Sequence, residues 1–370
     1  MKRVEIVVIG GGPAGSAAAS GLAALGREVV LIERAHGPHH KVCGEFLSIE
    51  TQGQLHRLGI NPAGLGAVEI ERVVVRSKIR DVAASLPFRA LSLSRYRLDQ
   101  ALLDHARDRG VQLKQGVTAR GVIPGDGEWT VLCDDDETLR CRHVVVATGK
   151  LGLRGIEDTR DGSQVGLKIH LRLTAEIRRV LAGQVELFLM DRSYAGLELV
   201  EDKICNLCCL LPRTVVMRLG ANWTGLQGYL SSMVPSLAER LAGAAPLFRK
   251  PIAVVCPKGG HLHSDAESGI YRVGDRLAHI PPFTGDGLAI ALASAALAVE
   301  HIRRGCPPDV YLAEARKLIG SAVRVASAVS GLAASRIGRA ALLGGATCAP
   351  AALIGAIARR TRLPLAAGWS

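Results

Sequence analysis

The sequence predicts an α/β fold in which a Rossmann-like nucleotide-binding domain carries an inserted mixed β-sheet and a helical C-terminal region. Three observations predict it: a glycine-rich strand–turn–helix at the N-terminus, a second glycine-rich turn after residue 270, and alternating apolar strands between them. A chain of 370 residues is long enough for two joined lobes with a sizeable core. Because aromatic residues make up only 4% of the chain, that core must consist mainly of Ala, Val, Leu and Ile.

The N-terminal segment reads VEIVVIGGGPAGSAAASGLAALGREVVLIER over residues 4–34. An apolar strand over residues 4–9 leads into glycines at GxGxxG spacing, and an Ala-rich helix over about residues 14–25 follows. Gly10 permits the tight turn, Gly12 lets a pyrophosphate approach the backbone, and Gly15 lets helix and strand pack closely. The candidate cofactor contacts in this segment are Gly10, Gly12, Pro13, Ala14, Gly15, Glu33 and Arg34.

Glu33 ends the second strand, which is expected over residues 28–32. A carboxylate at this distance from the glycines can accept hydrogen bonds from an adenosine ribose. The strand, the glycines and the acid together predict a dinucleotide site, although they do not separate NAD from FAD.

A second motif separates the two cofactors. Residues 270–292 read IYRVGDRLAHIPPFTGDGLAIAL, a strand followed by Gly-Asp, a Pro-Pro turn and a Gly-Asp-Gly sequence that opens an apolar helix. This segment resembles the second flavin motif of the p-hydroxybenzoate hydroxylase and geranylgeranyl reductase superfamily. The resemblance implies FAD, with Asp275 on the ribityl chain and the helix N-terminus near the pyrimidine end of the flavin. The implied contacts are Gly274, Asp275, Pro282, Gly285, Gly287 and Leu288.

Three other segments extend the resemblance. SRYRLDQA over residues 94–101 matches an RxxLD helix start and implies that Arg95 contacts FAD, the alternative being a solvated arginine. HVVVATG over residues 143–149 matches the strand beneath the adenosine. KVCGEFLS over residues 41–48 matches the loop beside the flavin ring in reductases of the group. The contacts implied around these segments are Cys43, Gly44, Arg95, Val117, Ala147, Thr148 and Gly149.

The chain also departs from the superfamily pattern at two places. ATGKLGLRG has Lys150 where many hydroxylases have the acid of a GADG motif, and YAGLELV has Gly196 where geranylgeranyl reductases have the Trp of YxWxFP. The chain therefore resembles a side branch of the superfamily.

The resemblance implies an FAD-dependent oxidoreductase with NAD(P)H as a transient reductant, since no second GxGxxG unit is present. The main prediction is a monooxygenase acting on a hydrophobic isoprenoid, polyketide or aromatic molecule. The alternative is a reductase of C=C bonds in an isoprenoid-like substrate, and a flavin-bound sensor without turnover is a third hypothesis. The sequence does not assign a catalytic acid or base. Candidates near the flavin ring are Cys43, Glu45, Tyr194 and Pro282, with a buried apolar role open for Cys43 and an exposed position open for Glu45.

The superfamily architecture implies discontinuous domains. We expect an FAD-binding domain over residues 1–72, 94–153 and 269–304, a substrate domain over 73–93 and 154–268, and a helical region over 305–370. Substrate-domain strands are expected over residues 73–77, 90–94, 164–177, 185–190, 196–200 and 204–211, with a helical stretch over 224–242.

The net charge of +12 is concentrated at the C-terminus, where residues 315–370 contain no Asp or Glu. Few aromatics and no recognition motif argue against nucleic acid. A basic apolar tail suits contact with an anionic membrane surface, an acidic partner or an anionic substrate. The alternative is that these helices pack on the core and expose their arginines to solvent. Residues 340–358 lack charge but are rich in Gly and Ala and contain Pro350, which disfavours a membrane span.

Nine cysteines in a long chain favour a reducing compartment. We expect a cytoplasmic protein without a secretory leader, with peripheral membrane association left open, and either a monomer or a homodimer. His36, His39, His40 and Cys43 lie close together in sequence, but they lack a second ligand pair and no metal site is predicted.

Overall fold

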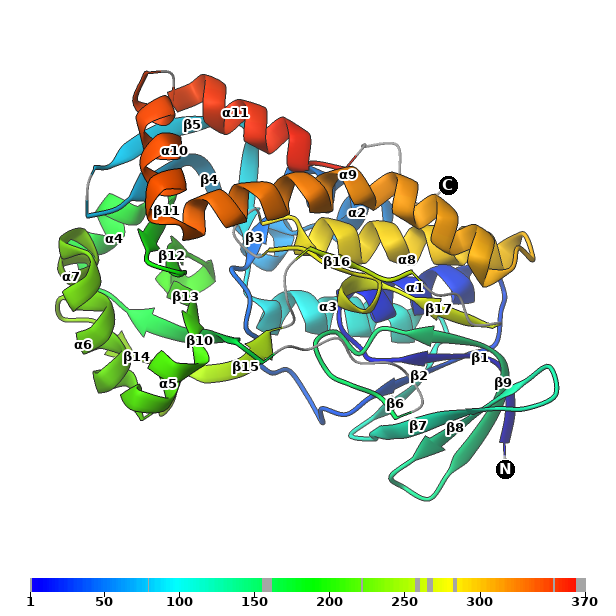
Figure 1. Cartoon of the computed structure of the whole chain (residues 1–370). Coiled ribbons are helices and arrows are strands. Elements are labelled where there is room, and N and C mark those ends of the chain that lie inside the picture. Colours follow the sequence, from blue (N-terminus) through cyan, green and yellow to red (C-terminus); the bar gives the residue numbers. More distant parts are fainter. Residues whose placement is uncertain are drawn as a thin grey trace.

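The computed structural model describes residues 2–78, 80–154, 162–220, 222–256, 260–264, 269–281, 285–348 and 350–363. Pro282, one of the expected site residues, lies outside the described residues. Figure 1 shows two sheets side by side, with long helices crossing over both.

The first sheet has seven strands in the order β6-β2-β1-β9-β8-β7, with β17 also paired to β9. Its pairings are parallel except for those made by β8 and β7. The strands are β1 (Lys2–Ile9), β2 (Val29–Glu33), β6 (Gln112–Gln115), β7 (Ala119–Pro124), β8 (Trp129–Cys133), β9 (Thr138–Val146) and β17 (Ile270–Arg272). The expected Rossmann-like domain is confirmed.

The strands of this sheet are apolar on both faces, so both faces must be covered. Helices cover one face, and the β7–β8 side covers the other. Ile6 and Val8 of β1 pack against helices, whereas Val7 and Ile9 pack toward the β7–β8 side. The covering helices are α1 (Pro13–Ala24), α3 (Arg95–Asp108) and α8 (Gly287–Arg303). Gly15 is required for this packing, since a Cβ there would lie 1.8 Å from the Gly10 carbonyl oxygen.

The second sheet has nine strands in the order β14-β10-β13-β12-β11-β4-β5-β3, with β15 also paired to β10. They are β3 (Phe46–Leu47), β4 (Val68–Arg76), β5 (Val82–Ser92), β10 (Gln164–Arg172), β11 (Gln184–Met190), β12 (Ser193–Leu199), β13 (Cys205–Pro212), β14 (Ala245–Pro246) and β15 (Ile252–Cys256).

Three details of this sheet differ from expectation. Strand β4 begins at Val68, before the expected boundary at residue 73, and β5 begins at Val82 rather than at residue 90. The strand expected over residues 164–177 ends at Arg172, because the Thr174 hydroxyl accepts from the Ile177 amide and caps a helix, α4 (Ala175–Leu181).

Helices on the outer face of the second sheet bury a separate apolar cluster. The helical stretch expected over residues 224–242 divides into two helices because Pro235 occupies the first turn of the second one. Besides α4, these helices are α5 (Arg213–Leu219), α6 (Trp223–Met233) and α7 (Pro235–Leu241).

The C-terminal region consists of α9 (Pro308–Ala334), α10 (Arg336–Cys348) and α11 (Pro350–Thr361). Figure 1 shows α9 running along α8, and α10 and α11 lying above β4 and β5. The uncharged segment at residues 340–358 divides between two helices, so it forms no single span. Within the described residues, α9 alone is long and apolar enough to cross a membrane, but it packs on core helices, and 39% of its most apolar window is buried.

The remaining elements lie in the segments between these strands and helices. They are α2 (Ile49–Arg57), the short 3₁₀ turns η1 (Ala63–Leu65), η2 (Glu201–Lys203) and η3 (Gly274–Arg276), and the two-stranded pair β16 (His261–Leu262) and β18 (Ala278–His279).

Candidate active site

A cavity of about 1110 Å³ runs from the glycine-rich loop between the two sheets to the C-terminal helices. It brings together segments that are far apart in sequence. The expected cofactor residues that line it are Gly10, Gly12, Pro13, Ala14, Glu33, Arg34, Cys43, Gly44, Arg95, Val117, Ala147, Thr148, Gly149, Gly274, Asp275, Gly285, Gly287 and Leu288. Gly15 packs behind the loop instead.

The glycine loop is held by the carboxylate of Glu33. The Gly11 amide donates to Glu33 Oε2 at 2.6 Å, and the Ala35 amide donates to Oε1 at 3.0 Å. The side chain is buried but still borders the cavity. Glu33 therefore shapes the loop in addition to offering oxygen atoms at the place expected for a ribose.

Two cations lie beside Gly12. A Cβ on Gly12 would lie 3.7 Å from Lys41 Nζ and 3.8 Å from Arg95 Nη2. Asp99 orients both cations, accepting from Arg95 Nε at 2.6 Å and lying 3.1 Å from Lys41 Nζ. Burial opposes the charge on Arg95, but the Asp99 carboxylate keeps the pKa of Arg95 raised. Arg95 is thus an oriented cation with only 12% of its side chain exposed, and not a solvated arginine.

Lys41 is a site residue that the sequence reading did not assign, although it begins the quoted KVCGEFLS segment. Its position between the glycine loop and Asp99 gives the cavity a second positive charge where an anionic pyrophosphate would approach. Nothing local in the sequence pairs Lys41 with Asp99.

Asp275 and Lys150 both line the cavity, and the charge of one influences the other. Burial would lower the pKa of Lys150, but the carboxylate of Asp275 raises it. The Asp275 side chain is 32% exposed, and its Oδ1 lies 4.0 Å from His279 Nδ1. The lysine that replaces the hydroxylase acid is therefore a cavity cation facing Asp275.

The loop at residues 41–48, which we call the flavin-side loop after its resemblance to the loop of the reductases, is fixed to the second sheet through Glu45. Glu45 is fully buried and has a left-handed backbone, with φ at 60°. Its Oε1 accepts from the Arg95 amide at 2.7 Å and from the Lys168 ammonium, and its Oε2 lies 2.8 Å from His170 Nε2. The alternative that placed Glu45 on the surface is wrong, because this carboxylate joins the loop, helix α3 and strand β10.

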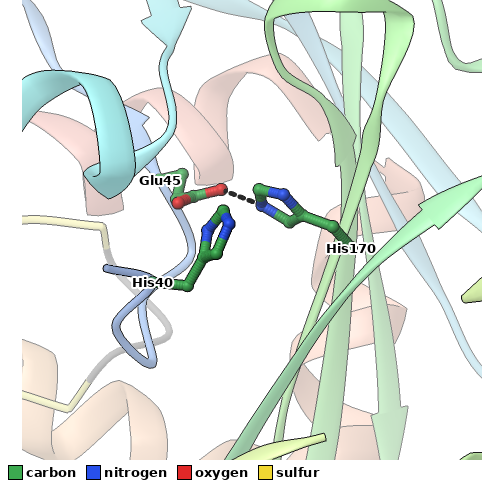
Figure 2. A group of neighbouring side chains, drawn as sticks. All are labelled: His40, Glu45 and His170. Atoms are coloured by element: carbon green, nitrogen blue, oxygen red, sulfur yellow. Dashed lines mark hydrogen bonds and ion pairs between the residues drawn. The ribbon is translucent and has the colours of Figure 1, made fainter. Parts of the chain in front are cut away.

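Figure 2 shows His40 beside Glu45 and His170. Their ligand atoms all lie within 4.8 Å of one another, a geometry that also suits a metal ion. The Lys168 ammonium already contacts Glu45 and supplies the compensating charge. Burial and the charges of His170 and Lys168 lower the pKa of His40 to about 4. Burial alone would raise the pKa of Glu45, but Lys168 and His170 have the larger combined effect and lower it. The group behaves as an ion cluster that positions the loop.

The second sheet presents Tyr194, Gly196 and Glu198 of β12 to the cavity, as period-two alternation requires. Asn206 Nδ2 donates to Glu198 Oε1 at 3.2 Å and to the Cys43 carbonyl oxygen at 3.2 Å. Burial raises the pKa of Glu198 to about 8, with a further contribution from Glu45 and opposition from Asn206 and Lys168. Sequence reasoning missed Glu198, although an acid at an alternate position of an apolar strand was a visible signal.

The far part of the cavity, which we call the apolar arm, lies between β4, β5 and β11 and the C-terminal helices. Its walls include Val75, Val82, Leu187, Leu343, Leu353 and Ile357. The C-terminal region therefore forms part of the site. Two of its arginines form ion pairs, the buried Arg339 with the exposed Asp191 and the partly buried Arg362 with the buried Asp286.

These residues fit an FAD molecule. The open backbone at Gly12, the N-terminus of α1 and the two cations suit a pyrophosphate, and Asp275 at the start of η3 suits a ribityl chain. A family model described as the FAD binding domain matches residues 3–156. The protein is an FAD-dependent oxidoreductase. Its fold is that of FAD-binding monooxygenases, halogenases and geranylgeranyl-reductase-like proteins.

The curated relatives of this chain include menaquinone reductases, flavin-dependent halogenases and a probable resorcinol 4-hydroxylase. The menaquinone reductase of Mycolicibacterium smegmatis is 24% identical over 341 residues, which cover 83% of this chain and 78% of the relative. The flavin-dependent halogenase armH1 of Armillaria mellea is 32% identical over 165 residues, which cover 40% of this chain and 32% of the relative.

Solved structures share the fold over nearly the whole chain. The flavin-dependent brominase Bmp2 has a TM-score of 0.77 at 16% identity and covers 96% of this chain and 94% of its own. A geranylgeranyl bacteriochlorophyll reductase-like protein of Thermoplasma acidophilum has a TM-score of 0.74 at 19% identity and covers 93% of this chain and 91% of its own.

Proposed function

We propose that this protein is an FAD-dependent reductase of a C=C bond in an isoprenoid chain, such as the side chain of a membrane quinone. The observation that carries the proposal is the apolar arm, whose walls are aliphatic from Val75 and Val82 to Leu343 and Ile357. Such walls suit a long hydrocarbon, because they contribute contact area and few hydrogen-bonding groups.

The relatives support the same choice. Similarity to a menaquinone reductase extends over 83% of the chain, whereas similarity to the halogenase covers 40%. The preference for a monooxygenase drawn from sequence alone is therefore replaced by its alternative, the isoprenoid reductase.

The site residues have distinct tasks in this proposal. Arg95 and Lys41 hold the pyrophosphate, Asp275 holds the ribityl chain, and Glu45 keeps the flavin-side loop against the second sheet. When bound, FAD supplies the hydride, which it receives in turn from NAD(P)H. The aliphatic walls orient the alkene and exclude water from it.

Anaerobic turnover tests the proposal. The FAD-loaded enzyme is reduced with NADH or NADPH, mixed with a menaquinone, exposed to air and extracted for mass spectrometry. A product two hydrogens heavier that survives reoxidation of the quinone ring supports C=C reduction. A ring-only change that disappears in air, or an added oxygen atom, overturns it.

We also propose that the protein contacts an anionic membrane surface from the cytoplasmic side, because the proposed substrate is membrane-soluble. The corner between α9 and α10 supports this idea. Ile337 is 85% exposed and Leu332 is 49% exposed, with the exposed Arg336 between them. Apolar side chains beside a cation suit insertion at an anionic interface.

A further inference from the structure

A row of three polar residues crosses the face of the second sheet that carries Glu198. Strands β10, β13 and β12 pair so that His170 lies opposite Asn206 and Asn206 lies opposite Glu198. The next row of the same face is Lys168, Cys208 and Gly196, and Gly166 lies beyond Lys168 along β10. Gly196, Cys208 and Gly166 line the cavity, so small residues border it beside the Glu198 carboxyl group, whereas the Lys168 ammonium pairs with Glu45.

Glu198 is held toward the flavin-side loop. Asn206 donates to both Glu198 Oε1 and the Cys43 carbonyl oxygen, so one amide group connects the acid to the loop that precedes Glu45. Within the described residues, no donor or acceptor is paired with Glu198 Oε2. The side chain is only 3% exposed yet borders the cavity. An Oε2 hydroxyl would therefore be available to a molecule inside the cavity.

The surroundings keep this carboxyl group protonated at neutral pH. Burial is the main reason that its pKa rises to about 8, and the negative charge of Glu45 adds to the effect. The Lys168 ammonium lowers the pKa of Glu198, but it is already paired with the Glu45 carboxylate. Cys205 on the neighbouring strand adds no negative charge, because burial raises the pKa of its thiol.

We infer that Glu198 is the catalytic acid that delivers a proton to the alkene. The inference rests on the proposed function. One alkene carbon gains hydride from reduced FAD and the other gains the Glu198 proton, so that two C–H bonds form and the C=C π bond is lost. The flavin is oxidised, and the Glu198 carboxylate regains a proton from water before the next turnover.

An infrared titration of the purified protein without substrate tests the protonation state. Wild type should show a protonated-carboxyl band at pH 7 that disappears above about pH 8–9, as expected for a buried acid with a raised pKa. That band should be absent in Glu198→Gln and present in the matched control Glu69→Gln, whose side chain is 56% exposed. Absence of the band in wild type at pH 7 overturns the assignment.

Single-turnover oxidation of the anaerobically reduced enzyme by menaquinone tests the catalytic role. Glu198→Gln should keep its FAD and its rate of reduction by NAD(P)H, yet lose about 100-fold or more in the rate of alkene reduction. The rate of alkene reduction in Glu198→Gln should also no longer change with pH near pH 8. An unchanged rate in Glu198→Gln overturns the role of Glu198 alone. A wild-type enzyme that never saturates the chain overturns the proposed function, and the infrared result then stands separately.

Discussion

Arg362, directly after α11, donates to Asp286, directly before α8, with Nη1 and Oδ1 2.8 Å apart. The guanidinium carbon also lies 4.4 Å from the centroid of the Phe88 ring on β5. The end of the C-terminal region is thereby connected to the helix whose N-terminus borders the cofactor site. This contact explains how the C-terminal helices come to close the apolar arm.

Arg362→Ala should loosen that closure. Removal of one partner leaves the Asp286 carboxylate buried, so we expect a loss of roughly 2–4 kcal/mol in the free energy of unfolding. Urea unfolding measures it, with the exposed Arg360→Ala as the control. Equal unfolding midpoints for the two variants would show that the contact does not stabilise the fold.

Asp275→Ala should lose most of its FAD and remain folded. The side chain is partly exposed and its substitution removes cofactor hydrogen bonds without disturbing core packing. The ratio of flavin to protein absorbance reports occupancy, and circular dichroism reports folding. Asp126→Ala is a matched control because it also follows a glycine but lies on an exposed turn. Full occupancy in Asp275→Ala would remove this residue from the site.

Gly44→Trp should block turnover and alter the visible spectrum of the flavin. Gly44 borders the cavity, and a Cβ built there meets no atom within 4 Å, so an indole would extend into the space that ligands need. Gly44→Ala should behave like wild type for the same reason. If Gly44→Trp keeps both activity and spectrum, the flavin ring lies away from this loop.

Glu198 should make the stability of the protein depend on pH. Its pKa is raised from 4.5 to about 8 in the folded protein, so the unfolded chain binds fewer protons between these values and stability falls as pH rises through them. Glu198→Gln removes this effect. The free energy of unfolding of the variant minus that of wild type should therefore be roughly 2–5 kcal/mol larger at pH 9 than at pH 4. Urea midpoints at both pH values provide the measurement. Parallel curves for variant and wild type would mean that Glu198 is ionised in the folded protein.

Binding to vesicles should require acidic lipids and weaken as salt increases. Leu332→Asp with Ile337→Asp should abolish co-sedimentation and leave bound FAD intact, because both side chains are largely exposed. Point variants are preferable to removing residues 340–370, since that deletion also takes away Leu343 and Arg362 from the cavity wall. Arg3→Gln with Arg120→Gln alters exposed charges of the first domain and is the control. Failure of wild type to bind anionic vesicles at low salt would overturn the membrane proposal.

Local sequence determined the glycine-rich turn. The positive φ of Gly10, the close contact of Gly15 with the Gly10 carbonyl oxygen and the Ser94 cap before α3 depend on residues a few positions apart, so steric and hydrogen-bonding rules identify them without the fold. The same rules predicted the strand–turn–helix order at both ends of the FAD domain and the break near Pro350.

Tertiary structure decided the substrate site. Glu198 meets Asn206 and the Cys43 carbonyl only through the register of β12 with β13, and Lys168 reaches Glu45 only because β10 passes beside the flavin-side loop. Burial then changes the chemistry of these groups, raising the pKa of Glu198 and pairing Glu45 with a lysine. No local pattern encodes the contacts with the flavin-side loop, because Lys168 lies 123 residues from Glu45 and Asn206 lies 163 residues from Cys43.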